Sequence, residues 1–300
     1  ITGAVSISSA ASAIDFGSET WTISGTWTNA STDGIVWEAG TGTVTFDSAT
    51  GGTMTFAGTN LAEAEFNNAT FTSSAGTAQT FTMATRGLRL GGTLTISDGA
   101  STTALNTSVG NLAITAGPVT IGAGGILTAN ASTITISGNF NFSAGTFTYG
   151  TSTVVFAASG TLTTPGTTVT HLGYMTINAG VVKTFDAVTW VHYILTVNGT
   201  LSSSGGDSQR YFVVLGSLAT TDPVVLGGAG DLSGSGFFVY AYRGSAASFN
   251  VVATTYQHLN IEGGRTDGAT SKADVANFAG NVSTTACGVY NQCAFLVRIE

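Results

Sequence analysis

The chain has 300 residues and a mass of 30.2 kDa. Charged residues make up only 8% of it, against roughly 25% in ordinary soluble domains. With a net charge of −8 and no basic patch, nucleic-acid binding and polybasic attachment to a membrane are excluded. The 17 Phe, 8 Tyr and 4 Trp residues exclude intrinsic disorder, because they give the chain enough apolar surface to pack.

Residues 1–19 are predicted to form a lead-in strand, since Val5 and Ile7 alternate with serine. No signal peptide is visible at Ile1, so the sequence indicates a mature or trimmed form. No apolar run reaches the roughly 18 residues that a membrane-spanning helix needs. We therefore expect no insertion into a membrane.

Residues 20–262 carry a repeated pattern in which Thr or Ser alternates with Ile, Phe, Tyr or Val between glycine corners. The first copy contains Trp21–Trp27, Gly40–Phe46, Gly52–Phe56, Gln79–Phe81 and Gly91–Ile96. About 110 residues later the same order returns at Ile134–Phe140, Gly150–Phe156, Lys183–Phe185 and Gly199–Leu201. A weaker third copy at Tyr256–Ile261 is similar to Thr170–Ile177. The alternation predicts many short strands.

Residues 263–300 depart from this pattern. Ser271–Asn277 is the only stretch with mild helical character, and Ala294–Ile299 predicts a closing strand. Cys287 and Cys293 are spaced so that a small disulfide loop can close between them, the alternative being two reduced thiols. A disulfide here would indicate an oxidising, extracytoplasmic compartment.

Two all-β architectures compete for the repeats. Tandem β-sandwiches fit the long offset between the two copies. A parallel β-helix (β-solenoid) has coils of about 20–25 residues that stack on one another. The scarcity of proline (3 residues), the Gly-Thr corners and the Thr-x-Thr pairs favour the β-helix, followed by an irregular C-terminal segment.

Four patterns carry a resemblance: Thr-Ile-Ser-Gly-x-Phe/Trp, Gly-Thr-x-Thr-Val-x-Phe, His-Leu-x-Ile and Gly-Thr-Leu. Over roughly residues 20–262 the chain resembles the repeats of large bacterial surface proteins, which are adhesin-like, β-helical exoproteins. The resemblance implies a secreted or cell-surface location and a structural or adhesive role. It carries no catalytic residues over to this chain.

The familiar nucleophile, phosphate-binding and zinc motifs are missing from the sequence, so we expect no enzyme, no cofactor and no metal site. Glu63 and Glu65 share one face of a predicted strand, which we interpret as two solvated side chains. Gly227–Asp231 is interpreted as a turn rather than a calcium-binding repeat. His171 and His258 occupy equivalent repeat positions, which indicates a shared structural position rather than a metal site.

Threonine ranks, tryptophans and glycosylation sequons are three further surface features of the sequence. Regular threonine ranks on a flat β-helix face can bind ice, but corners interrupt the ranks here, so ordinary strand residues are favoured. Tryptophans can stack on sugars if exposed, although core packing is the default for most of them: Trp21, Trp27, Trp37 and Trp190. Sequons offer surface glycosylation at Asn29, Asn68, Asn106, Asn130, Asn141, Asn198 and Asn281.

A β-helix exposes unpaired strand edges at its two ends, and no capping helix is visible at Ile1–Phe16. We therefore expect an extracellular structural subunit that assembles head to tail with its own copies into a filament or surface layer. The expected assembly residues, including an N-terminal donor strand, are Ile1, Val5, Ile7, Phe295, Val297 and Ile299. The alternative is a monomeric adhesin or carbohydrate-binding stalk with surface glycans as partners. A polysaccharide-cleaving β-helix enzyme ranks last.

Overall fold

The computed structural model is a parallel β-solenoid, as the repeats predict. Side chains are described for residues 1–7, 16–29, 40–56, 66–74, 76–97, 101–108, 110–165, 170–187 and 189–202. For Ser203 and the later strands, up to Arg298, the backbone alone is described. These residues form strands and no helix, and the strand pairings among them are parallel. Parallel pairing excludes tandem β-sandwiches, whose sheets are antiparallel.

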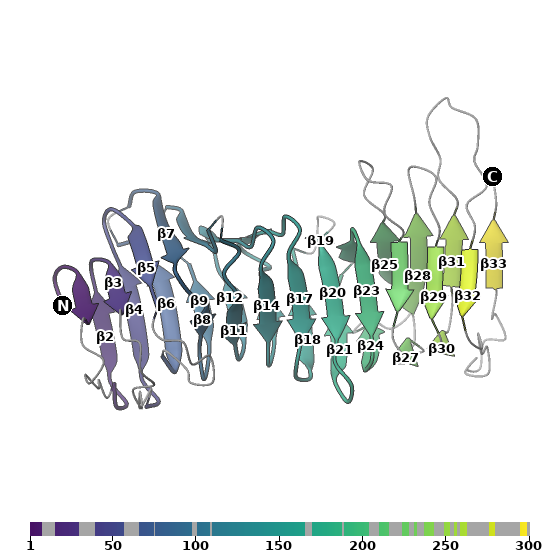
Figure 1. Ribbon diagram of the computed structural model, residues 1–300, viewed down its shortest axis with the longest axis horizontal. Coiled ribbons are helices and arrows are strands. Elements are labelled where there is room, and N and C mark those ends of the chain that lie inside the picture. The colour runs from purple at the N-terminus through teal and green to yellow at the C-terminus, as the bar shows by residue number, and fades with distance from the viewer. Residues whose placement is uncertain are drawn as a thin grey trace, which may run out of the picture. The chain divides into compact units, whose positions relative to one another are not determined.

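The chain divides into two compact units, Ile1–Ser152 and Thr153–Glu300. In the first unit, the strands of successive coils line up in three parallel stacks, and each coil contributes at most one strand to each stack (Figure 1). The β1 stack contains β1 (Val5–Ile7), β3 (Trp27–Asn29), β5 (Gly52–Thr55), β7 (Gln79–Ala84), β10 (Thr103–Asn106), β13 (Gly125–Thr128) and β16 (Thr146–Thr148). The β2 stack contains β2 (Thr20–Ile23), β4 (Thr43–Asp47), β6 (Asn68–Thr72), β9 (Leu94–Ile96), β12 (Val119–Ile121) and β15 (Phe140–Asn141). The β8 stack contains β8 (Leu88–Arg89), β11 (Ile114–Ala116) and β14 (Thr133–Ile136).

The second unit is built in the same way. Its β17 stack contains β17 (Thr153–Phe156), β20 (Tyr174–Ile177), β23 (Ile194–Val197), β26 (Val224–Gly227), β29 (Phe249–Val252) and β32 (Ala276–Ala279). Its β18 stack contains β18 (Gly160–Thr163), β21 (Val182–Phe185), β24 (Thr200–Ser203), β27 (Asp231–Leu232) and β30 (Thr255–Tyr256). Its β19 stack contains β19 (Thr170–Leu172), β22 (Thr189–Val191), β25 (Arg210–Leu215), β28 (Phe237–Tyr242), β31 (Leu259–Glu262) and β33 (Phe295–Arg298).

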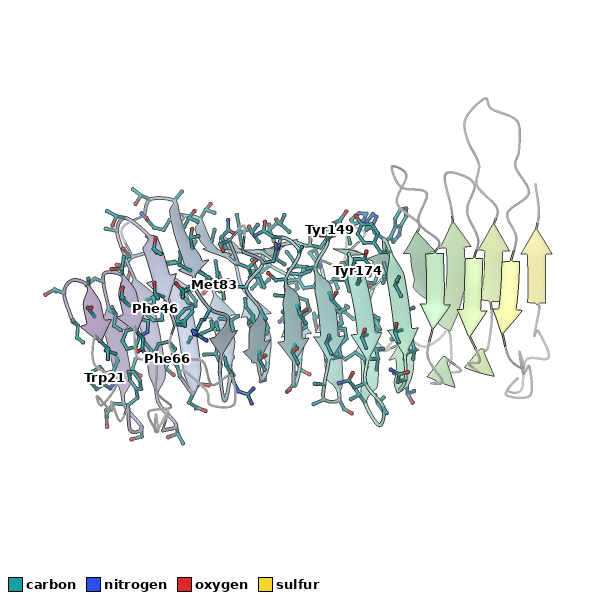
Figure 2. All side chains as sticks on the ribbon, viewed as in Figure 1. Trp21, Phe46, Phe66, Met83, Tyr149 and Tyr174 are labelled. Carbon is teal, nitrogen blue, oxygen red and sulfur yellow. The ribbon has the colours of Figure 1, made fainter. Side chains whose placement is uncertain are left out.

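Alternating side chains fill the interior of each coil, because successive residues of a strand point to opposite faces. In β4, Val44 and Phe46 are buried while Thr43 and Thr45 lie half-exposed outside. Register carries the pattern from coil to coil: Phe46 lies beside Phe71, and their rings stack 5.0 Å apart. Figure 2 shows Phe46 and Phe66 inside the first coils, where their rings meet edge to face at 5.7 Å. Truncating such a ring to Ala is expected to cost about 3–5 kcal/mol.

Glycine corners let the coils stack closely. Gly17 and Gly40 both adopt φ of +57°, a left-handed conformation that favours glycine. A Cβ on Gly40 would collide with the backbone carbonyl of Gly17 in the coil before it. The corner therefore excludes larger residues twice over, by conformation and by contact.

Two sequence expectations are corrected by the backbone. The mild helical character of Ser271–Asn277 is not realised at its C-terminal end, since β32 begins at Ala276 and pairs in parallel with β29. Helix propensity is a weak local preference, which pairing with a neighbouring coil overrides. The long offset of about 110 residues is no structural period either, because one coil takes about 20–25 residues. The strands expected at Val5–Ile7 and near the C-terminus are confirmed as β1 and β33.

Candidate functional site

Five aromatic and imidazole rings gather where β19 meets β20 and β22 meets β23. His171 Nδ1 lies 2.7 Å from His192 Nε2 on the next coil, and the two rings stack with centroids 4.9 Å apart. Tyr174 and Tyr193 stack at 4.7 Å, and the Trp190 ring meets His171 edge to face at 5.4 Å. Figure 2 shows Tyr174 at the start of β20. All five side chains are half-buried, so each keeps part of its ring at the surface.

Backbone bonds between the coils hold this cluster. The His192 amide donates to the Leu172 carbonyl at 2.9 Å, and the Tyr193 amide donates to the Gly173 carbonyl at 3.1 Å. Burial lowers the pKa of His171 below its ordinary value. Burial, and secondly the neighbouring His171, lower the pKa of His192. Both imidazoles are therefore mainly neutral at pH 7, and one ring N–H is shared between the two facing nitrogens.

Sequence reasoning did not find this pair, because it aligned His171 with His258. Backbone register links His171 through Trp190, Val213 and Tyr240 to Asn260. Asn260, rather than His258, thus occupies the position equivalent to His171, and His258 itself lies outside the described residues. The true partner, His192, comes from the adjacent coil. His192 lies two residues beyond Trp190, the register partner of His171, so neither repeat alignment nor coil length alone predicts the contact.

Lys183 is the second unusual side chain of this unit. It is fully buried in β21, with its Nζ 4.4 Å above the centre of the Phe156 ring. Burial lowers its pKa to about 8. The sequence aligned Lys183 with Gln79, and both prove to be inward-facing polar residues, Gln79 donating to the Ala49 carbonyl. Their alternation with Phe185 and Phe81 was the signal that could have identified them.

The side chains of several predicted glycosylation asparagines form hydrogen bonds to neighbouring coils. Asn68 Nδ2 donates to the Thr41 and Gly42 carbonyls at 3.3 and 3.2 Å, while its Oδ1 accepts from the Thr93 amide at 2.8 Å. Asn130 Nδ2 donates to Asn106 Oδ1 at 2.9 Å. Such a side chain cannot carry a glycan and keep its bonds.

The other sequons differ in exposure. Asn29 is buried, with 2% of its surface exposed. Asn141 is half-buried and its Oδ1 accepts from Ser143 Oγ at 2.8 Å, whereas Asn198 is exposed at a corner. Asn281 lies outside the described residues. Only Asn141 and Asn198 therefore remain as sterically open sequons among those described.

The tryptophans and threonines are also placed. Trp27 is buried, Trp21 and Trp190 are half-buried, and Trp37 lies outside the described residues. The threonine rank is continuous across coils, because corners interrupt it only along the chain; its members are Thr22, Thr45, Thr70, Thr95 and Thr120. Threonine is the ordinary residue of a half-exposed strand face, so the rank by itself identifies no ligand.

The expected assembly residues lie mainly in edge strands. Val5 and Ile7 belong to β1, and Ile1 is 57% exposed in the first coil. The backbones of Phe295 and Val297 lie in β33. Outside the described residues are Ile299, Glu63, Glu65, the loop 228–230, Cys287 and Cys293, so the disulfide and the solvated glutamates stay predictions.

Comparison with protein-family models, curated proteins and solved structures finds no match. Within the described ranges, no group of three or more His, Cys, Asp or Glu side chains is placed to hold a metal ion. Nor does that part of the chain contain a helix long and apolar enough to cross a membrane.

Proposed function

We propose that the protein is an extracellular structural subunit whose copies assemble through strand edges into a cell-surface filament or layer. The observation that carries the proposal is the outer edge of β1. Strand β1 pairs with β3 on one side, and the described residues supply no strand for its other side. An unpaired edge of this kind is a template for another strand.

Residues 1–7 carry none of the usual protection of an edge strand. Residues 1–7 contain no charged side chain and no proline, which are the devices that block strand addition elsewhere. The apolar side chain of Ile7 is buried in the chain's own core. We therefore propose β1 as an accepting edge, and the N-terminal donor strand expected from the sequence is the alternative arrangement of the same interface. In the second unit, β30, β32 and β33 each end a stack and pair with one neighbouring strand among the described residues.

The experiment removes one outward N–H from this edge. The Val5 amide donates to the Thr26 carbonyl at 2.9 Å, so it points inward toward β3. Backbone groups of successive strand residues point to opposite edges, which directs the Ser6 amide outward. Ser6→Pro deletes that donor and leaves the bonds to β3 in place. We expect S6P to abolish or strongly slow the growth of filaments seen by electron microscopy.

Ser6→Ala is the matched control, because it alters the same side chain and keeps the N–H. It should assemble like the unaltered protein, and circular dichroism should show that S6P keeps its β-structure. Filaments of S6P that grow at the unaltered rate would remove β1 from the interface. A protein that remains monomeric at every concentration by analytical ultracentrifugation would contradict the assembly itself.

A monomeric adhesin or carbohydrate-binding stalk is the second candidate. It is favoured by the half-buried Trp190, whose ring contacts His171 at one end of the cluster of five rings, since tryptophan presents a broad apolar face with a polar edge. Trp190→Ala should then abolish binding to a glycan array, while Trp21→Ala serves as the control from the other unit. Equal binding by the two variants would exclude this cluster as the sugar site.

A further inference from the structure

Two neutral imidazole nitrogens face each other across neighbouring coils of the second unit. The distance of 2.7 Å between His171 Nδ1 and His192 Nε2 is that of a hydrogen bond. Imidazole nitrogen is the commonest metal ligand in proteins, and it suits zinc, copper and nickel. Backbone pairing of the same two coils flanks the pair on both sides, through β19 with β22 and β20 with β23.

The spacing is close to what a metal ion needs. With metal–nitrogen bonds of about 2.0–2.1 Å, the square-planar or tetragonal geometry of Cu²⁺ places two neighbouring nitrogens about 2.9 Å apart, and a tetrahedral ion places them about 3.3 Å apart. From its hydrogen-bonded distance of 2.7 Å the pair must therefore open by about 0.2 Å for Cu²⁺ and by about 0.6 Å for a tetrahedral ion. His171 lies in β19 and His192 directly follows β22, and both side chains are half-buried, so the opening requires a rotation of the two side chains.

We propose that His171 and His192 form a two-nitrogen site for a divalent transition-metal cation, with Cu²⁺ bound most tightly. On binding, the N–H shared between the rings passes through solvent to the other nitrogen of the same imidazole, so both facing lone pairs reach the metal and no net proton is released. Water completes the coordination, because no third His, Cys, Asp or Glu among the described side chains joins the pair. The bound ion joins the β19 coil to the β22 coil.

The order of affinities follows from ligand chemistry. Cu²⁺ should bind more tightly than Ni²⁺ or Zn²⁺, as for other sites with nitrogen ligands. Mg²⁺ and Ca²⁺ should not bind, because they require oxygen ligands. The site does not depend on assembly at β1, so it can be present whether or not filaments form.

Trp190 provides the readout, because its ring lies 5.4 Å from that of His171 and bound Cu²⁺ quenches nearby indole fluorescence. Titration of the full chain with CuCl₂ should show one ion per chain by calorimetry and a matching loss of fluorescence. Trp190→Phe should retain the calorimetric binding and lose the fluorescence change. His171→Ala and His192→Ala should each weaken binding by on the order of tenfold or more.

His258→Ala is the matched control, since it removes the only other histidine of the chain, and it should bind Cu²⁺ like the unaltered protein. Equal affinity of H171A, H192A and the unaltered protein would overturn the proposal. A second measurement needs no variant: electron paramagnetic resonance of the unaltered protein with Cu²⁺ should show coupling to two imidazole nitrogens. A spectrum with oxygen ligands alone would also overturn it.

Discussion

Replacing Lys183 by Met should stabilise the protein at neutral pH. Lys183 is fully buried above the Phe156 ring, and burial lowers its pKa from the ordinary value of 10.5 to about 8. Its folded pKa is the lower one, so between pH 8 and 10.5 the unfolded chain binds more protons than the folded chain. Stability therefore rises with pH across this window, and it is lowest where the buried amine is charged.

The magnitude follows from the two pKa values. Between pH 7 and pH 10 the linkage relation gives the Lys183 amine a gain of about 2.5 kcal/mol in the free energy of unfolding. Methionine has a similar length and no charge, so Lys183→Met should lose this pH dependence. At pH 7 it should be more stable than the unaltered protein by about 1–3 kcal/mol, less whatever the contact of the ammonium with Phe156 contributes.

Guanidinium unfolding at pH 7 and pH 10, followed by circular dichroism, measures both quantities. The difference between the two proteins should shrink as the pH rises, since the amine of the unaltered protein becomes neutral. Lys272→Met, the only other lysine substitution that the chain offers, controls for the loss of a lysine from the chain. A K183M variant that is less stable at pH 7, or that gains as much as the unaltered protein between pH 7 and pH 10, would refute the reasoning.

Two further predictions concern asparagines. Asn130 has φ of +51° and its side chain donates a hydrogen bond to the preceding coil. In thermal unfolding, Asn130→Ala should therefore lower the free energy of unfolding by about 1–3 kcal/mol, and Asn130→Gly should lower it by about 1 kcal/mol less. A glycine variant less stable than the alanine variant would contradict the role of the positive φ. In a glycosylating host, glycopeptide mass spectrometry of the folded, secreted protein should find glycans at Asn141 or Asn198 and none at Asn29 or Asn68. A glycan at Asn68 would show that its ladder to the neighbouring coils is dispensable.

Strands and their inward faces could be predicted from the sequence because they depend on local alternation. Val44 and Phe46 alternate with threonine, and the structure buries both of them. The same rule, applied to Lys183, would have placed its side chain inside, since it shares its face with Phe185. The helical tendency of Ser271–Asn277 failed where it met a neighbouring strand, because pairing between coils outweighs local propensity.

The candidate site was harder to predict because its members come from different coils. His171 and His192 are 21 residues apart, whereas strand register places Trp190 opposite His171. Their contact depends on a coil length that varies between coils through the corners. The similarity of the two sequence segments aligned His171 with His258 instead, although strand register places Asn260 at the position equivalent to His171.

By itself, the sequence determined that glycine corners would separate short strands with an apolar inner and a hydroxyl-rich outer face. It could not determine which side of the coil a strand occupies. Trp21–Trp27 runs from the β2 stack to the β1 stack, whereas the similar text at Ile134–Phe140 runs from the β8 stack to the β2 stack. Alternation is a property of neighbouring residues, but the side of the coil depends on how many residues each corner takes. The number of residues in each corner, and therefore every contact between coils, is decided only when the coils stack.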